Sequence, residues 1–150
     1  MIAILSGLLT PLIAVVATFI AYQQWQTNRQ KLILDRYDRR LRVYEEVKKY
    51  LSIVIRDADV TYEASIKFVT SVSEADFLFG AEIPRYIDDL YKRGVDLHHW
   101  KSEYRDSTQP IPPGYDHKKV VDNMHAQLNW FVVQLEPAKQ KFKKYLDVSR

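Results

Sequence analysis

The chain of 150 residues contains no cysteine and only four glycines. Without cysteine it cannot form a disulfide scaffold, a thiolate zinc site or a cysteine nucleophile. Four glycines are too few for a glycine-rich phosphate loop or for a β-barrel with many turns. The rest of the composition, 47% hydrophobic and 27% charged, is typical of a folded protein and not of a disordered one.

Charge is missing from the beginning of the chain, where residues 1–28 carry no charged side chain. Residues 2–22 would make a helix of about 31 Å, which matches a bilayer core of roughly 30 Å. Eleven of these 21 residues are Leu, Ile, Val or Phe, and together they favour insertion by about 3 to 7 kcal/mol. The sequence therefore predicts a transmembrane anchor over 1–25. A cleaved signal peptide would need a basic start and a small-residue cleavage site, and neither is present.

The residues after the apolar run fit a membrane interface. Tyr22 and Trp25 stand where an aromatic belt is expected, and Arg29 and Lys31 follow at the edge of water. Six basic residues lie within 29–42 and none precedes the run. The positive-inside rule therefore places the N-terminus outside and residues 26–150 in the cytoplasm. Pro11 leaves one point open: the continuous helix begins there, or Pro11 lies inside it as a mild kink.

The remainder of the chain is predicted to be all-α, an antiparallel bundle of about four helices that continues from the membrane helix. Between Leu34 and Ala58 the apolar residues recur at spacings of three and four, which is one helical stripe. No proline or glycine interrupts the chain between Pro11 and Gly80. Further helices are expected over about 60–72, 83–104 and 120–135, with a short helix after Pro137 and a proline-rich loop over 106–116.

Three packing details follow from the spacing. In the second helix, Ile66 and Val69 mark the expected apolar side. Before the third helix, Ser73 and Asp76 resemble a helix cap. Within the third helix, Gly94 falls on the apolar stripe and indicates a close helix contact.

Basic residues flank an acidic middle. The net charge is +4 over 26–50, −5 over 51–136 and +4 over 137–150. In an up-and-down bundle the C-terminal end returns toward the bilayer, where each basic residue gains about 1 kcal/mol from anionic headgroups. The alternative is that these residues only fix the topology or solvate a helix end. The possible contacts with anionic lipid are Arg36, Arg39, Arg40, Lys139, Lys141, Lys143 and Lys144.

Two of these arginines, Arg36 and Arg40, are one helical turn apart. They repel each other unless an anion lies between them. We expect lipid phosphate or an acidic stretch of the bundle to supply that anion.

No pattern indicates catalysis. His98 and His99 are adjacent and point to different helix faces, and His117 and His125 are eight residues apart, so no metal site is predicted. The chain contains no nucleophile elbow, Walker loop or HExxH motif. We therefore expect no enzyme activity, no cofactor and no small-molecule substrate. Nucleic-acid binding is not expected either, because no basic stripe is interleaved with aromatics.

The string YQQWQTNRQKLILDRYDRRLRVYEE, over 22–46, resembles a motif in a widespread group of small bacterial membrane proteins. These have one N-terminal span and a helical cytoplasmic region. The similarity continues in FLFGAEIPRYIDDLYKRGVDL, over 77–97, and in the terminal KFKKYL, so it covers most of the chain. The resemblance implies this architecture, a location in a bacterial inner membrane, and no particular activity.

Two functions fit these features. The first is a membrane-anchored, non-enzymatic interaction module that binds a protein partner or self-associates, with ten tyrosines as contact material. The second is a membrane effector whose span oligomerises and permeabilises the membrane when triggered. Ala3 and Gly7 form a small-residue pair suited to helix contact, but the span lacks a polar, pore-facing stripe. We rank the interaction module first.

Overall fold

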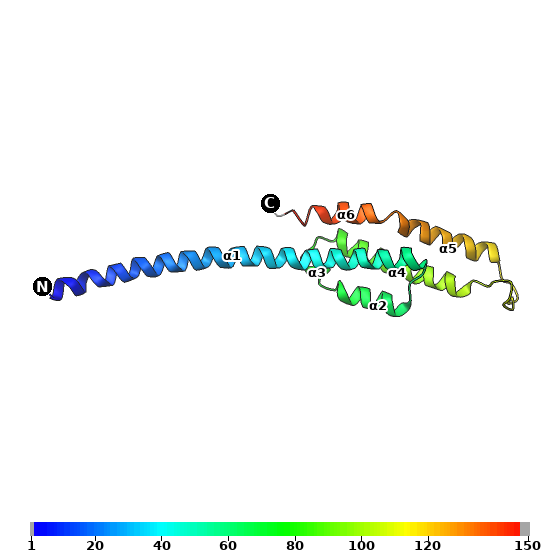
Figure 1. Cartoon of the computed structure of the whole chain (residues 1–150), viewed down its shortest axis with the longest axis horizontal. Helices are drawn as coiled ribbons and strands as arrows, with labels where there is room; N and C mark the ends of the chain where they lie inside the picture. Colours follow the sequence, from blue (N-terminus) through cyan, green and yellow to red (C-terminus); the bar gives the residue numbers. More distant parts are fainter. Residues whose placement is uncertain (1, 148–150) are drawn as a thin grey trace. The chain divides into compact units, whose positions relative to one another are not determined.

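The computed structural model describes residues 2–147, with side chains from residue 11 onward. All regular structure within that range is helical, which confirms the predicted all-α class. The chain forms two units, Met1–Asp38 and Arg39–Arg150, and α1 contributes residues to both. The helices are α1 (Ile2–Asp57), α2 (Tyr62–Ser71), α3 (Ala75–Leu78), α4 (Glu82–Glu103), α5 (His117–Val132) and α6 (Leu135–Lys143) (Figure 1).

The first unit, Met1–Asp38, consists of the N-terminal part of α1. This helix begins at Ile2 and passes through Pro11, so Pro11 is an interior residue and not the start of the helix. Every side chain from 11 to 36 is exposed. Among the described residues, no helix carries an apolar stretch long enough to cross a bilayer. Residues 2–10 of the expected span, with the small pair Ala3 and Gly7, lie outside the described side chains.

The second unit, Arg39–Arg150, is an antiparallel helical arrangement. Figure 1 shows α2 returning along α1, α4 running back again, and α5 with α6 returning once more. The C-terminal end of α6 therefore lies at the end of the unit where α1 enters it. A hydrogen bond confirms this, because the Arg40 guanidinium donates to the carbonyl oxygen of Tyr145 at 3.2 Å.

The core of the second unit is built on α1. Val47, Leu51 and Val54 are completely buried, as the predicted stripe requires. Leu34 also belongs to that stripe but lies in the first unit and is 55% exposed, so the stripe packs only over its later part. The other fully buried large side chains are Val72, Ile83, Leu90, Leu97, Phe131 and Phe142.

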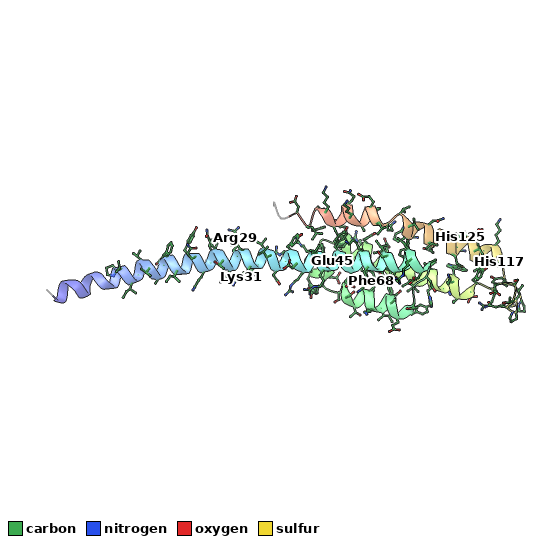
Figure 2. The ribbon with its side chains drawn as sticks, in the orientation of Figure 1. Arg29, Lys31, Glu45, Phe68, His117 and His125 are labelled. Atoms are coloured by element: carbon green, nitrogen blue, oxygen red, sulfur yellow. The ribbon has the colours of Figure 1, made fainter. Side chains whose placement is uncertain are left out.

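The expected close contact at Gly94 is confirmed. A Cβ atom placed there would overlap the Tyr50 hydroxyl and lie 3.2 Å from Cγ1 of Val60. The Tyr50 hydroxyl is held in place by Ser65, at 3.2 Å, and its ring stacks on Phe68 with centroids 4.1 Å apart. Figure 2 shows Phe68 between α2 and α1. Only glycine leaves room for this arrangement.

The prediction that Ile66 and Val69 mark the buried, apolar side of α2 is wrong. Ser65, Phe68 and Val72 are buried, whereas Ile66 is 61% and Val69 40% exposed. Both sets have helical spacing, and the polar Ser65 disguised the true face because its hydroxyl is satisfied by Tyr50. Buried polar groups are tolerated when they have such a partner.

The structure also tests three of the predicted helix boundaries. Ser73 does not cap α3, whose N-cap is Glu74 without a side-chain hydrogen bond. Pro137 does not end a helix, because α5 already stops at Val132 and Pro137 lies in the first turn of α6. Proline is tolerated there because that turn has no intrahelical partner for the missing N–H. The predicted loop over 106–116 is confirmed between α4 and α5.

Candidate functional site

The residues expected at the membrane interface form a local cluster on α1. The rings of Tyr22 and Trp25 lie 6.1 Å apart, and the Arg29 guanidinium lies 5.7 Å from the Trp25 ring. The Gln26 amide donates to the Tyr22 hydroxyl at 3.1 Å. Figure 2 shows Lys31 on the opposite side of the helix from Arg29. Tyr22, Trp25, Gln26 and Arg29 therefore share one helix face. On that face the aromatic rings contact the basic group.

Arg40, one of the expected lipid contacts, is engaged inside the second unit. Its Nε donates to the Leu78 carbonyl at 3.0 Å and its Nη1 to the Tyr145 carbonyl at 3.2 Å. The guanidinium also lies 5.8 Å from the Phe79 ring and 5.5 Å from the Tyr145 ring. These carbonyl dipoles and ring faces supply the negative potential for which we expected an anion. We therefore assign Arg40 a role within the fold, joining α1 to α3 and to the chain end.

Two other expected lipid contacts on α1, Arg36 and Arg39, remain on the surface. Arg39 lies 3.7 Å from the Glu74 carboxylate, and both side chains are half exposed. Arg36 is exposed in the first unit. Such exposed ion pairs contribute at most about 1 kcal/mol each.

The three lysines of α6 and Lys144, its C-cap, divide into two pairs. One pair faces α4: the Lys144 ammonium lies 2.5 Å from the Glu82 carboxylate, and Lys141 lies 5.5 Å from the Tyr86 ring. The hydrogen bond from Lys144 lowers the pKa of the Glu82 carboxyl. Burial raises the pKa of Tyr86 well above its ordinary value, so that ring remains neutral beside Lys141.

The other pair, Lys139 and Lys143, lines a groove where α6 meets α1. The groove has a volume of about 360 Å³, and its remaining lining residues are Tyr44, Leu146 and Asp147. Burial raises the pKa of the Tyr44 hydroxyl, with a smaller contribution from Glu136. The two lysines make the groove basic, and its floor is apolar. The sequence identified four lysines as possible lipid contacts but did not show which two of them line this groove.

A second groove separates α1 from α2. It has a volume of about 260 Å³, and its charged lining residues are two acids, Glu46 and Glu63, and two bases, Lys49 and Lys67. Glu46 accepts from Lys49 at 3.5 Å and from the Ser71 hydroxyl at 3.3 Å. Because its acids and bases are equal in number and partly paired, this groove favours no ligand charge.

A histidine–carboxylate pair was missed by the sequence reasoning. His98 Nδ1 lies 3.1 Å from Asp59 Oδ1, which also accepts from the Val60 backbone N–H at 2.7 Å. The ring of Tyr62 meets His98 edge-on at 4.6 Å. The pair ties the turn between α1 and α2 to α4. No local pattern reveals it, because the two residues are far apart in the chain.

His117 and His125 belong to another helix, α5. His117 is the first residue of α5 and lies 3.3 Å from the Tyr115 hydroxyl, and Figure 2 shows His125 further along the same helix. In the part of the chain that the structure describes, no group of three or more histidine or carboxylate side chains is placed to hold a metal ion.

Comparison with family models, with curated proteins and with solved structures found no match to this chain.

Proposed function

We propose that the protein is a single-pass, membrane-anchored interaction module without catalytic activity, with residues 1–25 in the inner membrane of a bacterium and the second unit in the cytoplasm. One observation carries the proposal: α1 has no charged side chain before Arg29, and its described side chains in this stretch are all exposed. Leu, Val, Ile and Phe left in water cost free energy, and lipid removes that cost.

The interface cluster supports the same proposal. Tyr22, Trp25 and Arg29 follow the apolar stretch in the order expected at a lipid headgroup region, with rings first and cation last. The cation–π contact of Arg29 with Trp25 keeps the guanidinium against the ring while it reaches water or phosphate.

The surface that we propose for a protein partner is the outer face of α2. Tyr62, Ile66 and Val69 are exposed there and share one face by their spacing. An exposed row of apolar side chains on a short helix is typical of a contact surface. We assign the partner, or a second copy of the chain, to this row.

The anchor is tested by topology. The chain has no cysteine, so Thr108→Cys in the exposed loop gives one labelling position. In intact cells a membrane-impermeant maleimide should leave this cysteine unlabelled, and permeabilised cells should give full labelling. The chain should also remain in the pellet after an alkaline carbonate wash. Labelling in intact cells would overturn the orientation, and release by carbonate would overturn the anchor.

The partner surface is tested by crosslinking in isolated membranes. A photoreactive crosslinker on Ile66→Cys should give one product of defined, larger mass. The same reagent on Asp122→Cys, an exposed position on α5, is the matched control and should give none. No product from Ile66→Cys, or the same products from both positions, would overturn the assignment of α2.

A further inference from the structure

The connection between α4 and α5, residues 104–116, is longer than the fold requires. Antiparallel helices in a bundle are usually joined by about two to eight residues, and longer loops without regular structure are usually functional. This loop lies at the end of the second unit opposite to the entry of α1 (Figure 1). Its residues are exposed except Arg105 and Tyr115, which are partly buried. Length and exposure together indicate a role beyond linking two helices.

The centre of this loop is restricted to an extended conformation by its own prolines. A proline fixes its φ at about −65°, and the residue before a proline is kept out of the helical region. Because prolines occupy positions 110, 112 and 113, every residue over 109–113 is under one of these restrictions. Both restrictions fit the polyproline II helix, which is extended and forms no internal hydrogen bonds. The segment 109–113, QPIPP, therefore has little conformational freedom to lose on binding.

A hydrogen-bonded turn fixes the entry to this segment. The N–H of Gln109 donates to the carbonyl oxygen of Asp106 at 3.3 Å. The Asp106 carboxylate accepts from the N–H of Thr108 at 2.8 Å and from its hydroxyl at 2.6 Å. Aspartate favours the first position of a turn because its side chain bonds the backbone two residues on.

A second turn fixes the exit. The N–H of Tyr115 donates to the carbonyl oxygen of Pro112 at 3.2 Å. Pro113 and Gly114 occupy the centre of this turn, and Gly114 has a φ of +81°, which is the combination of a type II turn. The Tyr115 hydroxyl then closes the base of the loop, where it accepts from the N–H of Arg105 at 3.0 Å. Both ends of the segment are thus held in place before any partner arrives.

The surface of the segment is apolar and open. Ile111 is 68% exposed, and a Cβ atom placed at Gly114 would meet no atom within 4 Å. Pro110 and Pro113 are also exposed. They lie three residues apart, so they share one edge of a polyproline II helix. An isoleucine left in water costs free energy, and a partner that covers this edge would recover it.

The absence of charge narrows the kind of partner. Residues 107–115 contain no charged side chain, so the segment offers no cation to a nucleic acid or to an anionic headgroup. A groove lined with aromatic side chains fits it better. Aromatic rings pack on proline rings, and their hydroxyl or indole N–H groups donate to the backbone carbonyls, which have no partner within a polyproline II helix.

We propose that residues 109–113 are a docking segment for a cytoplasmic protein domain that binds polyproline II in an aromatic-lined groove. Pro110 and Pro113 pack on the aromatic rings, with Ile111 beside them. The two turns lower the conformational entropy that binding costs. The inference rests on the proposed cytoplasmic location of the second unit and deepens the interaction function, because it names the chemistry of a partner. The segment does not include the apolar row on α2 and is a second contact surface.

The test places a photoreactive crosslinker beside the segment. Ser107→Cys, at an exposed position, carries the reagent and leaves residues 109–113 unchanged. Membranes that contain the full-length protein are mixed with the soluble fraction of the bacterium in which the chain is native and are irradiated. One product of defined mass should form. An excess of synthetic peptide 106–116 should abolish it, and the same peptide with alanine in place of its three prolines should leave it unchanged.

A variant pair gives a second readout. Pro110→Ala combined with Pro113→Ala in the Ser107→Cys chain should lower the yield of the product by about tenfold. Pro84→Ala combined with Pro137→Ala is the matched control, because it removes two prolines from the first turns of α4 and α6. The control should give the full yield. Far-UV circular dichroism of both double variants should show the helical content of the unaltered chain.

Four results would overturn the proposal. The first is the absence of a product, and the second is equal competition by the two peptides or equal loss in the two double variants. The third is a product with twice the mass of the chain, which would assign the contact to a second copy. The fourth is a link, located by mass spectrometry, to a lipid or to a protein surface without an aromatic-lined groove.

Two measurements on the same membranes separate this inference from the proposed function. The Ile66→Cys crosslink reports on the α2 row, so its persistence without a Ser107→Cys product overturns the docking segment alone. The maleimide labelling of the loop reports on the cytoplasmic location. If that location fails, the crosslink is repeated in intact cells. There a product that depends on the prolines would still support the docking segment, and the lack of one would overturn it as well.

Discussion

The apolar side chains of the two units have opposite surroundings. Leu12 and Phe19 in the first unit are 63% and 62% exposed, whereas Leu51 and Phe142 in the second unit are completely buried. Fully burying a side chain of this kind contributes about 1.5–3 kcal/mol. The second unit obtains that free energy from its own helices. The first unit contains no other helix to supply it, and under the proposed function lipid covers these side chains.

The largest effect is expected from breaking the apolar surface of the first unit. Val15→Asp combined with Phe19→Asp places two carboxylates in the expected span, at about 3 kcal/mol each. The double variant should move from the membrane pellet to the supernatant after a carbonate wash. Asn28→Asp with Gln30→Asp adds the same charge outside the span and should not. If both double variants are distributed alike between pellet and supernatant, the claim that lipid covers the apolar residues of the first unit is contradicted.

The second effect contrasts two phenylalanines. Phe142→Ala empties a fully buried site and should cost about 3–5 kcal/mol of unfolding free energy. Phe77, on α3, is 90% exposed, so Phe77→Ala should change that free energy by less than about 0.5 kcal/mol. Denaturant unfolding of the full chain in detergent, followed by near-UV circular dichroism, measures both. A comparable loss in the two variants would be inconsistent with the described core.

A third effect concerns the contact of α4 with α1. Gly94→Ala should cost about 1–3 kcal/mol, because the new Cβ overlaps the Tyr50 hydroxyl and the helices must move apart. In a Tyr50→Phe background the overlapping oxygen is gone, so the same substitution should cost less. Unfolding free energies of the four proteins in this double-mutant cycle give the coupling. Strict additivity would mean that the hydroxyl is not the obstacle.

A fourth effect separates two arginines on α1. Arg40→Gln removes two hydrogen bonds from a charged donor to the carbonyls of Leu78 and Tyr145, which should cost about 1.5–3 kcal/mol. Arg36→Gln, at an exposed position, should stay within about 0.5 kcal/mol. The midpoint of thermal unfolding compares the two. An equal shift would contradict the role of Arg40 within the fold.

The smallest effect is a pH dependence. Lys144 lowers the pKa of Glu82 below its ordinary 4.5, so the ion pair stabilises the folded state above that pH. The contribution is lost as the pH falls through the lowered value, because the carboxylate is then protonated. Glu82→Gln should therefore flatten the fall in melting temperature below about pH 4.5, whereas Asp122→Asn should not. Identical acid profiles for the two variants would remove Glu82 as a cause.

Local periodicity predicted most of the helices and little of the tertiary contacts. The end of α1 near Ala58, the loop over 106–116 and the role of Gly94 follow from spacing and from proline and glycine positions. The face of α2 was mistaken because Ser65 is a buried polar residue. The acceptors of Arg40 are backbone carbonyls, which carry no sequence signature. The pairing of His98 with Asp59 likewise depends on how distant segments pack.

The division of the α6 lysines shows the same limit. Composition identified Lys139, Lys141, Lys143 and Lys144 as one basic block. Which of them pair internally depends on Glu82 and Tyr86 on another helix. Only the packed structure distinguishes the two lysines that line the groove.

Amide hydrogen exchange of the full chain in phospholipid vesicles tests the central claim most directly. A helix without tertiary contacts opens easily in water and exchanges fast, whereas one surrounded by lipid is protected. We expect amides of residues 12–22 to exchange as slowly as those of the buried segment 47–54, and the loop over 106–116 to exchange fast. Exchange of residues 12–22 at the rate of that loop would contradict the account, because lipid would then not cover the first unit.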